Sequence, residues 1–319
     1  MYLTGKKKYT DFCLNEPVLP IFMQNWWLDA VCENPDDWQP IYAKDKNGVI
    51  DAVIICHTRK KFFFKKTGEP PLTQFSGVWF REKKFVKRSE KYHFIKKNLD
   101  VLIPQMPHAD VYFFRLQYKL TDAQPFFWKG FETTVRYTYR LENVKNFSEL
   151  QFQMNDNTCR NIKKGATQYT IEISNDWQTF VQLNNSVFAR QNKIVPIANQ
   201  VWKRLDAVLS EKNARTILFA RNKTSGQIDA GVYIIFDFDT AYYLAGGCNA
   251  VGRNNGALYF SLHNAIQTAS ERVDIFDFEG SMLKNVEPVF RGFGGIQTPY
   301  LTIEKTTNIL LKFLNIFKN

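Results

Sequence analysis

The feature that most constrains the fold of this chain is an internal repeat. Three short runs recur in the same order and at a nearly constant offset. The pairs are Asp110–Phe114 with Asp274–Phe278, Pro125–Phe131 with Pro288–Phe293, and Thr133–Tyr139 with Thr298–Ile303. One such pair could arise by chance, or from two unrelated strand–turn–strand units, but three pairs in order are typical of a duplicated domain. The sequence therefore predicts two tandem copies of one unit.

The segments upstream of the repeat also correspond. In the first half, predicted strands at Gln39–Ala43 and Val49–Cys56 flank the turn Asp45–Gly48, which is a good hairpin signal. In the second half, predicted strands lie at Thr216–Ala220 and Ala230–Phe236. Both halves thus begin their sheet with an antiparallel pair.

Further elements complete each half. A strand at Thr240–Ala245 is expected to correspond to Leu72–Phe80, and helices at Lys87–Ile103 and Gly256–Glu271 precede the repeated strands. Antiparallel strands followed by a helix-linked pair predict a mixed, mostly antiparallel sheet flanked by helices, an α/β (α+β) fold.

The length of the chain fits this duplication. A chain of 319 residues suits two domains of about 150 residues. We place the boundary near Leu141–Asn146 and predict domains at 1–143 and 144–319. No Gly/Ser-rich linker marks the boundary, so we expect the halves to pack tightly.

Charge and cysteine usage limit the classes of function. The chain has 42 Lys+Arg against 31 Asp+Glu, a net charge of +11, which favours an anionic partner such as a phosphorylated cofactor, a nucleic acid or an acidic membrane surface. Five widely spaced cysteines form no CxxC pair, and the histidines lack metal-ligand spacing, so we expect reduced thiols and no metal. We also expect no signal peptide and no spanning helix, hence a cytoplasmic protein.

The second repeat carries a specific resemblance. Phe276–Ser281 (FDFEGS) followed by Val289–Gly294 (VFRGFG) resembles the DF-x-G … FK-x-x-FG closing signature of the FemAB-like branch of the GNAT acyltransferase superfamily. Ile21–Ala30, Gly130–Tyr139 and Cys159–Lys164 also look like that family. Its members contain two GNAT-type domains in one chain. The resemblance therefore implies two tandem GNAT-like domains and an acyl-transfer activity.

A phosphate-binding segment is predicted where Arg253–Leu258 follows a strand and opens a helix. Free N–H groups and the partial positive charge of a helix N-terminus suit a pyrophosphate. The family holds coenzyme A at an Arg/Gln-x-x-Gly-x-Gly/Ala loop here; Arg253 and Gly256 match, whereas Leu258 stands where Gly or Ala is usual. The predicted cofactor-binding residues are Arg253, Asn254, Asn255, Gly256 and Ala257. The alternative is the glycine-containing start of a helix beside a solvated arginine. The corresponding Arg81–Glu90 has no glycine.

Two acids are candidate catalytic groups. Strand alternation places Asp277 and Glu279 on one side of the repeated strand. A carboxylate at a strand end can accept the proton that an amine loses as it attacks an acyl carbonyl. The alternative is a pair of structural carboxylates that bind backbone N–H groups or an arginine. The first copy has Phe113 and Arg115 at these positions, which places the chemistry in the second half.

Two further candidates follow from the resemblance. Arg291 occupies the place of the family lysine that is thought to stabilise the tetrahedral intermediate, and a guanidinium can supply the same charge. The alternative is an ion pair with Glu279 or Glu287. Tyr243 lies on the strand before the phosphate segment, where a tyrosine can protonate a departing thiolate. Half-buried strands are commonly rich in tyrosine, so a packing role is the alternative.

One part of the sequence is strongly basic. Arg81–Lys97 contains eight Lys or Arg, and Lys60–Lys66 interleaves lysine with phenylalanine. Such segments can contact tRNA phosphates or an anionic membrane, or form a solvated face. The apolar stripe in Asn308–Lys318 is expected to pack against a domain rather than a membrane.

These observations favour an N-acyltransferase that moves an acyl group from an activated donor to an amine acceptor, such as a cell-envelope precursor. Acyl-CoA is the favoured co-substrate, and we expect no permanently bound cofactor. One alternative is a Fem-type transferase that uses aminoacyl-tRNA. The other is a non-catalytic, degenerate tandem GNAT that binds an anionic ligand.

Overall fold

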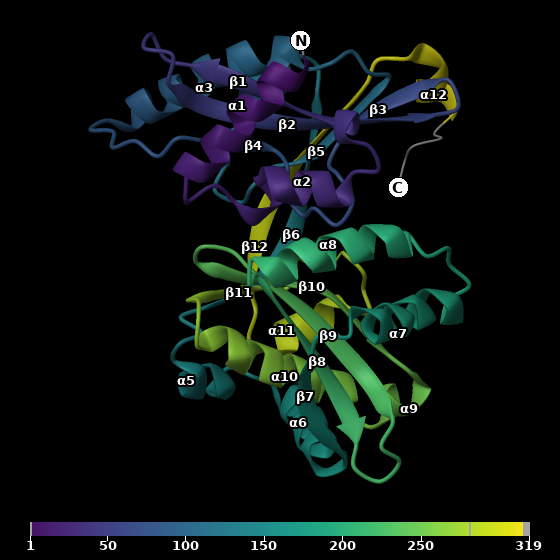
Figure 1. Cartoon of the computed structure of the whole chain (residues 1–319). Helices are drawn as coiled ribbons and strands as arrows, with labels where there is room; N and C mark the ends of the chain where they lie inside the picture. The colour runs from purple at the N-terminus through teal and green to yellow at the C-terminus, as the bar shows by residue number, and fades with distance from the viewer. Residues whose placement is uncertain (1, 281, 315–319) are drawn as a thin grey trace. The chain divides into compact units, whose positions relative to one another are not determined.

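The computed structural model describes residues 2–280 and 282–314, and most of its helices and strands are labelled in Figure 1. The chain divides into two compact units. Unit 1 comprises Met1–Arg136 and Pro299–Asn319, and unit 2 comprises Tyr137–Thr298. The predicted domains, 1–143 and 144–319, differ from these units mainly at the C-terminus, which belongs to unit 1.

Unit 1 is built on a sheet in the order β1-β2-β3-β5-β12, with β4 paired to β2. Its strands are β1 (Trp38–Lys44), β2 (Ile50–Lys61), β3 (Phe64–Gly68), β4 (Val78–Phe80) and β5 (Val111–Arg115), joined by β12 (Ile296–Thr306). Its helices are α1 (Tyr2–Asn15), α2 (Asn25–Val31), α3 (Arg88–Leu102), α4 (Gln124–Trp128) and α12 (Ile309–Leu314), with single 3₁₀ turns at Ile21–Met23, Pro35–Asp37 and Ile103–Gln105. Only β3 and β5 are parallel among these pairs.

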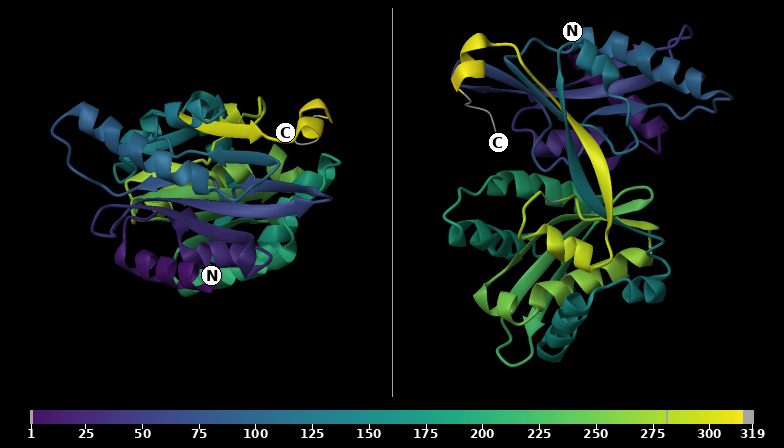
Figure 2. Two further views of the ribbon diagram at one scale, coloured as in Figure 1. Left: turned by 90° about the horizontal axis from the view of Figure 1, so that it is seen from above. Right: turned by 180° about the vertical axis from the view of Figure 1, so that it is seen from behind.

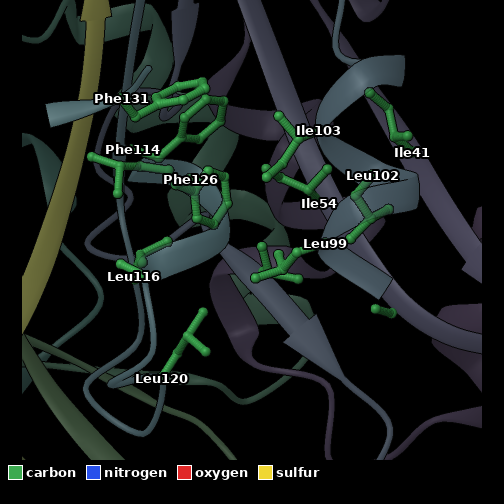
Figure 3. Packing of buried hydrophobic residues seen from close by; sticks show 14 of the residues in the cluster. Ile41, Ile54, Leu99, Leu102, Ile103, Phe114, Leu116, Leu120, Phe126 and Phe131 are labelled. Carbon is green, nitrogen blue, oxygen red and sulfur yellow. The ribbon is translucent and has the colours of Figure 1, made fainter. Parts of the chain in front are cut away.

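The core of unit 1 forms where α3 covers the sheet. Leu99 and Leu102 recur at helical spacing and point into a cluster with Ile54 of β2 and Phe114 of β5 (Figure 3). Phe126 of α4 closes the same cluster and is fully buried.

Unit 2 has a sheet in the order β6-β11-β10-β9-β8-β7. The strands are β6 (Glu132–Glu142), β7 (Tyr169–Ser174), β8 (Arg215–Asn222), β9 (Ile228–Phe236), β10 (Thr240–Cys248) and β11 (Ile275–Asp277). The helices are α5 (Phe147–Phe152), α6 (Asp156–Gln168), α7 (Trp177–Arg190), α8 (Asn199–Glu211), α9 (Ala250–Asn254), α10 (Ala257–Ser270) and α11 (Glu287–Gly292). Only β10 and β11 are parallel among these pairs.

Helices cover both faces of the unit 2 sheet. The cluster that contains the apolar side chains of α10 includes Val232 and Ile234 of β9, whereas Phe180 of α7 packs on Tyr233, with ring centroids 5.2 Å apart. Successive residues of a strand point to opposite faces. Therefore α10 and α7 lie on opposite faces, and the predicted helix-flanked mixed sheet is confirmed.

A buried ion pair fixes α8 to the sheet. The guanidinium of Arg215 on β8 donates to both carboxylate oxygens of Asp206, at 2.9 and 3.3 Å, and to Asn175 at 2.6 Å. The hydroxyl of Tyr233 donates to the same carboxylate at 2.8 Å. Buried charges require such a full set of partners, because removing one leaves the other desolvated and unpaired.

The predicted repeat is visible in the strand order. In each unit a helix, α3 or α10, links two parallel strands, and a short helix, α4 or α11, then leads to a long strand. The expected correspondence of Thr240–Ala245 with Leu72–Phe80 is wrong, because the strand parallel to β5 is β3.

The two long strands are exchanged between the repeats. β6 follows the first repeat in the chain but pairs with β11, whereas β12 follows the second repeat but pairs with β5 (Figures 1 and 2). This exchange explains why a single boundary near Leu141–Asn146 does not describe the units: each sheet is completed by the long strand that follows the other repeat.

Candidate functional site

The centre of unit 2 contains a point where two parallel strands separate. β10 pairs with β11 over three residue pairs only, ending at Tyr242 opposite Asp277. β10 then shifts register between Tyr243 and Ala245 and continues along β9 to Cys248. Among the described strands, none pairs with that edge of β10 beyond Tyr242. The backbone of this stretch therefore presents N–H and C=O groups to one side without a strand partner.

Tyr243 lies at this point, and an aromatic ring of α11 packs against it. Its ring packs on Phe290 of α11 with centroids 5.9 Å apart, and Phe290 stacks on Phe278 at 4.7 Å. A Cβ at Gly246 would lie 2.0 Å from the Tyr243 hydroxyl, so the glycine provides the space for it. Burial raises the pKa of Tyr243 above its ordinary value, and the phenol therefore stays protonated at neutral pH.

Asp277 lies at the same point but is fully buried. Its carboxylate accepts hydrogen bonds from the Thr138 hydroxyl at 2.5 Å and from the backbone N–H of Glu279 at 2.8 Å, and Arg140 lies 3.9 Å away. These are the contacts of the structural alternative that the sequence left open. β11 ends at Asp277, and Glu279 has φ +58°, so the expected strand alternation does not extend to Glu279.

Arg291 is on α11, and its side chain is 60% exposed. It forms an ion pair with Glu287 at 2.5 Å and donates to the Tyr139 hydroxyl at 3.3 Å. The same hydroxyl donates to Glu287 at 2.6 Å and accepts from Gln297 at 3.0 Å. The pairing with Glu287 is therefore present, and a role of Arg291 in stabilising an oxyanion stays a prediction.

The Tyr139 cluster was not predicted, because Tyr139 and Gln297 are distant from the acids along the chain. Tyr139 is on β6, which pairs with β11 only because the long strands are exchanged. The repeat itself was the one available signal for this pairing, because β6 and β12 occupy equivalent positions in the two copies.

The far end of β10 is basic. The guanidinium of Arg190, the last residue of α7, donates to the backbone O of Cys248 at 3.0 Å. Burial raises the pKa of the Cys248 thiol, and the positive charges of Arg190 and Arg253 oppose that rise. Arg190 contacts the last residue of β10, and Arg253 follows on α9, where its backbone N–H donates to Asn249 O at 3.1 Å. Arg190 was not among the predicted site residues.

A buried aspartate holds this junction. The Asn249 side chain caps α9 by accepting from Gly252 N at 2.8 Å and donates to Asp229 at 2.7 Å. The Tyr169 hydroxyl donates to the same carboxylate at 3.0 Å. A Cβ at Gly247 would lie 2.6 Å from backbone atoms of α7, so that glycine allows α7 to approach β10 closely.

The predicted phosphate segment divides into two parts. Arg253 and Asn254 belong to α9, and Asn255 follows that helix. Gly256 has φ +75° and precedes Ala257, which begins α10. A Cβ at Gly256 would lie 2.3 Å from the backbone O of Asn161 on α6.

A second glycine shows the same close approach from the α6 side, because a Cβ at Gly165 would lie 2.7 Å from the Gly256 carbonyl oxygen. Lys164 also donates to the Asn254 carbonyl at 2.7 Å. In this structure, therefore, the segment around Gly256 packs against α6, which is the helix-start alternative, and phosphate binding by Asn254–Ala257 stays a prediction.

The equivalent point in unit 1 is occupied by a side chain. β3 and β5 also pair over three residues, ending at Gly68 opposite Phe113. The carboxylate of Glu69 then accepts a hydrogen bond from the backbone N–H of Arg115. The guanidinium of Arg115 lies 3.8 Å from the same carboxylate. Burial raises the pKa of Glu69 to about 7. In unit 1, therefore, the Glu69 side chain bridges the separated strands.

The described residues contain neither a cluster of metal ligands nor a helix that could cross a membrane. No group of three or more His, Cys, Asp or Glu there could hold a metal ion. No helix within the described ranges has the length and apolar character that crossing a membrane requires.

Comparison with solved structures identifies the fold. The crystal structure of FemX superposes with a TM-score of 0.66 over 97% of this chain and 98% of that chain, at 13% sequence identity. The chain has the fold of FemX. This confirms the predicted FemAB-like resemblance at the level of the fold.

Other structures share the FemX-like fold. The C-terminal domain of a putative lysylphosphatidylglycerol synthetase from Agrobacterium fabrum gives a TM-score of 0.54 at 10% identity, covering 98% of this chain and 94% of that chain. L-PGS from Bacillus licheniformis gives 0.52 at 10% identity with the same coverage. No protein-family model and no curated protein matches the chain in sequence. At these identities the likeness establishes the fold alone.

Proposed function

We propose that this chain is an N-acyltransferase that holds an activated acyl donor in unit 2. The observation that carries the proposal is the separation of β10 from β11, which leaves one edge of β10 from Tyr243 to Cys248 without a strand partner. An extended ligand that contains amide groups can pair with such an edge as an added strand does. The pantetheine arm of coenzyme A has this character, so acyl-CoA is the favoured donor and a co-substrate rather than a bound cofactor.

The basic end of β10 suits the phosphates of the same donor. Arg190 contacts the backbone O of Cys248 and Arg253 lies on the α9 helix that follows, and charge-assisted hydrogen bonds from guanidinium to phosphate are among the stronger polar contacts in proteins. In the proposal, Arg253 keeps its predicted role and Arg190 joins it. Asn254, Asn255, Gly256 and Ala257 then shape the start of α10 beside α6.

The reaction places the thioester carbonyl near Tyr243. The amine attacks this carbon, so that a C–N bond forms and the C–S bond breaks, and the thiolate takes its proton from the Tyr243 phenol. Burial keeps that phenol protonated by raising its pKa. We assign the amine proton to the Glu279 carboxylate, while Asp277 holds the turn through the N–H of Glu279.

Two alternatives to this proposal differ from it in the donor or in the absence of transfer. An aminoacyl-tRNA would present an ester to the same amine, and the net charge of +11 favours such a polyanion. A non-catalytic tandem protein would bind an anionic ligand at Arg190 and Arg253 without transfer. Acyl-CoA and aminoacyl-tRNA are both cytoplasmic, so we place the reaction there, with an amine-bearing envelope precursor as the acceptor.

Calorimetric titration with coenzyme A, acetyl-CoA and longer acyl-CoAs tests the proposal. We expect Arg190→Ala and Arg253→Ala each to weaken binding about 10-fold, the effect of losing one charged hydrogen bond. Arg88→Ala in unit 1 is the matched control and should leave affinity unchanged. Release of free thiol in the presence of an amine panel then measures transfer. Absence of binding by every acyl-CoA, together with salt-dependent binding of aminoacyl-tRNA, would replace the coenzyme A version by the alternative.

A further inference from the structure

The β2–β3 hairpin of unit 1 ends in an unusual apex. Its sequence, Arg59–Lys66, reads RKKFFFKK: five basic residues, three phenylalanines and no acid. Lys61 pairs with Phe64, so Phe62 and Phe63 form the turn, with exposed fractions of 83% and 98%. Phe62 also has φ +57°, a conformation that costs free energy for a bulky residue. Neither packing nor turn chemistry explains two phenylalanines here, because they contact little of the unit and a glycine or asparagine would form the turn at lower cost.

Like charges face each other along the same hairpin. Lys60 lies directly opposite Lys65, and Arg59 lies directly opposite Lys66. Side chains so paired have Cβ atoms about 5 Å apart, and like charges in this arrangement destabilise a sheet. Arg59, Lys60 and Lys65 are exposed. An anionic surface against the hairpin would neutralise this repulsion.

A second apolar element is tied to the hairpin. The carboxylate of Asp110 accepts from the backbone N–H of Lys65 at 2.8 Å and from the side chain of Asn308 at 2.9 Å. Asn308 directly precedes α12, and both Figures 1 and 2 show α12 beside the strands of this hairpin. On α12, Ile309 and Leu310 are 68% and 65% exposed, whereas Leu311 is buried and anchors the helix. The expected packing of the Asn308–Lys318 stripe against a domain therefore holds at Leu311 but not at Ile309 and Leu310, and residues 315–318 of the stripe lie outside the described residues.

We propose that the hairpin apex and α12 form a surface that docks on an anionic lipid bilayer. The docking surface consists of Arg59, Lys60, Phe62, Phe63, Lys65, Ile309 and Leu310. Exposed aromatic and aliphatic side chains enter the boundary between headgroups and acyl chains, while neighbouring lysines bind anionic headgroups. A single-stranded nucleic acid would use the phenylalanines for base stacking and the lysines for phosphates, but it gives no reason for two exposed aliphatic residues on α12. This inference goes beyond acyl transfer and does not depend on it.

Vesicle flotation with the full chain tests the docking surface. We expect binding to vesicles of phosphatidylcholine with about one third phosphatidylglycerol, weak binding to pure phosphatidylcholine, and loss of binding as salt rises. Phe62→Asn with Phe63→Ser should weaken binding at least about 10-fold, because two inserted apolar side chains are lost. Asparagine tolerates the positive φ, so the thermal midpoint should not fall.

The substitution Lys60→Glu separates docking from folding. It converts the like-charged pair with Lys65 into an ion pair, so the thermal midpoint should stay constant or rise. Vesicle binding should nevertheless fall about 25-fold, because one attraction worth about 5-fold is removed and a repulsion of similar size replaces it. Lys203→Glu and Phe152→Ser in unit 2 are matched controls that change an exposed lysine and an exposed phenylalanine, and they should bind like the original chain.

Equal vesicle binding by the original chain and Lys60→Glu, or by the original chain and the double phenylalanine variant, would overturn the proposal. So would binding to tRNA that the same variants weaken, without binding to vesicles. These outcomes are independent of coenzyme A titration, so failure of docking and failure of the acyltransferase proposal are distinguishable.

Discussion

The substitution Gly256→Ala tests whether the start of α10 is a packing contact. Gly256 has φ +75°, and a Cβ there would lie 2.3 Å from the backbone O of Asn161. Two costs therefore combine. The left-handed conformation costs an alanine about 1–2 kcal/mol, and forcing a methyl group into a packed contact costs about 1–3 kcal/mol more. We expect the free energy of unfolding to fall by about 2–5 kcal/mol.

A matched glycine separates the two costs. Gly226, in the β8–β9 turn of the same unit, has φ +70°, but a Cβ there would meet no atom within 4 Å. Gly226→Ala should therefore lose only the conformational part, about 1–2 kcal/mol. The difference between the variants measures the crowding of α10 against α6.

Urea denaturation of the ligand-free protein gives both losses, and amide hydrogen exchange in α6 and α10 localises them. Faster exchange in both helices of Gly256→Ala, and not of Gly226→Ala, is the expected result. If the two variants lost the same stability, the contact with α6 would be irrelevant. A role of Gly256 confined to phosphate binding would then be supported, particularly if Gly256→Ala bound the donor more weakly.

Three further predictions address other groups. Tyr243→Phe keeps the ring on Phe290 and should change the free energy of unfolding by less than about 1 kcal/mol. The rate of acyl transfer should fall at least about 100-fold because the proton donor is lost. An unchanged rate would exclude Tyr243 as the acid. Asp206→Ala leaves Arg215 buried without its carboxylate and should cost about 3–5 kcal/mol by urea denaturation; a loss under about 1 kcal/mol would contradict the account of α8. Burial raises the pKa of Glu69 from 4.5 to about 7, so its contribution to the free energy of unfolding is present below pH 4.5 and is lost as the pH rises through about 7. The free energy of unfolding of Glu69→Gln, relative to that of the original chain, should therefore rise by up to about 3 kcal/mol between pH 4.5 and about 7. A difference in stability between the two proteins that does not vary with pH would refute the raised pKa.

Much of the fold was accessible from the sequence because the repeat is a pattern of order rather than of single residues. The runs at Asp110–Phe114 and Asp274–Phe278 became β5 and β11, and the helical stretch Gly256–Glu271 became α10. Periodicity and order along the chain are local properties, so one sequence suffices to read them.

The pairing of strands across a sheet is not a local property, so it could not be predicted from one sequence. Nothing in the residues of β6 and β12 indicates that each pairs with the strand of the other repeat. The surroundings of Asp277 depend on that exchange, since Thr138 and Arg140 come from β6. Gly256 likewise matched a phosphate pattern, because a glycine that allows a close helix contact and a glycine that allows a ligand to approach look identical in sequence.

In the proposed function, unit 2 holds its donor along the edge of β10 beyond Tyr242. Amide hydrogen exchange of the full chain, measured with and without saturating acyl-CoA, tests this placement of the donor. We expect slower exchange of the amides between Tyr243 and Cys248, with no change at the equivalent point of unit 1 around Glu69, where a side chain already bridges the strands. Bound acyl-CoA that left the amides of β10 unchanged and slowed exchange in unit 1 would contradict it.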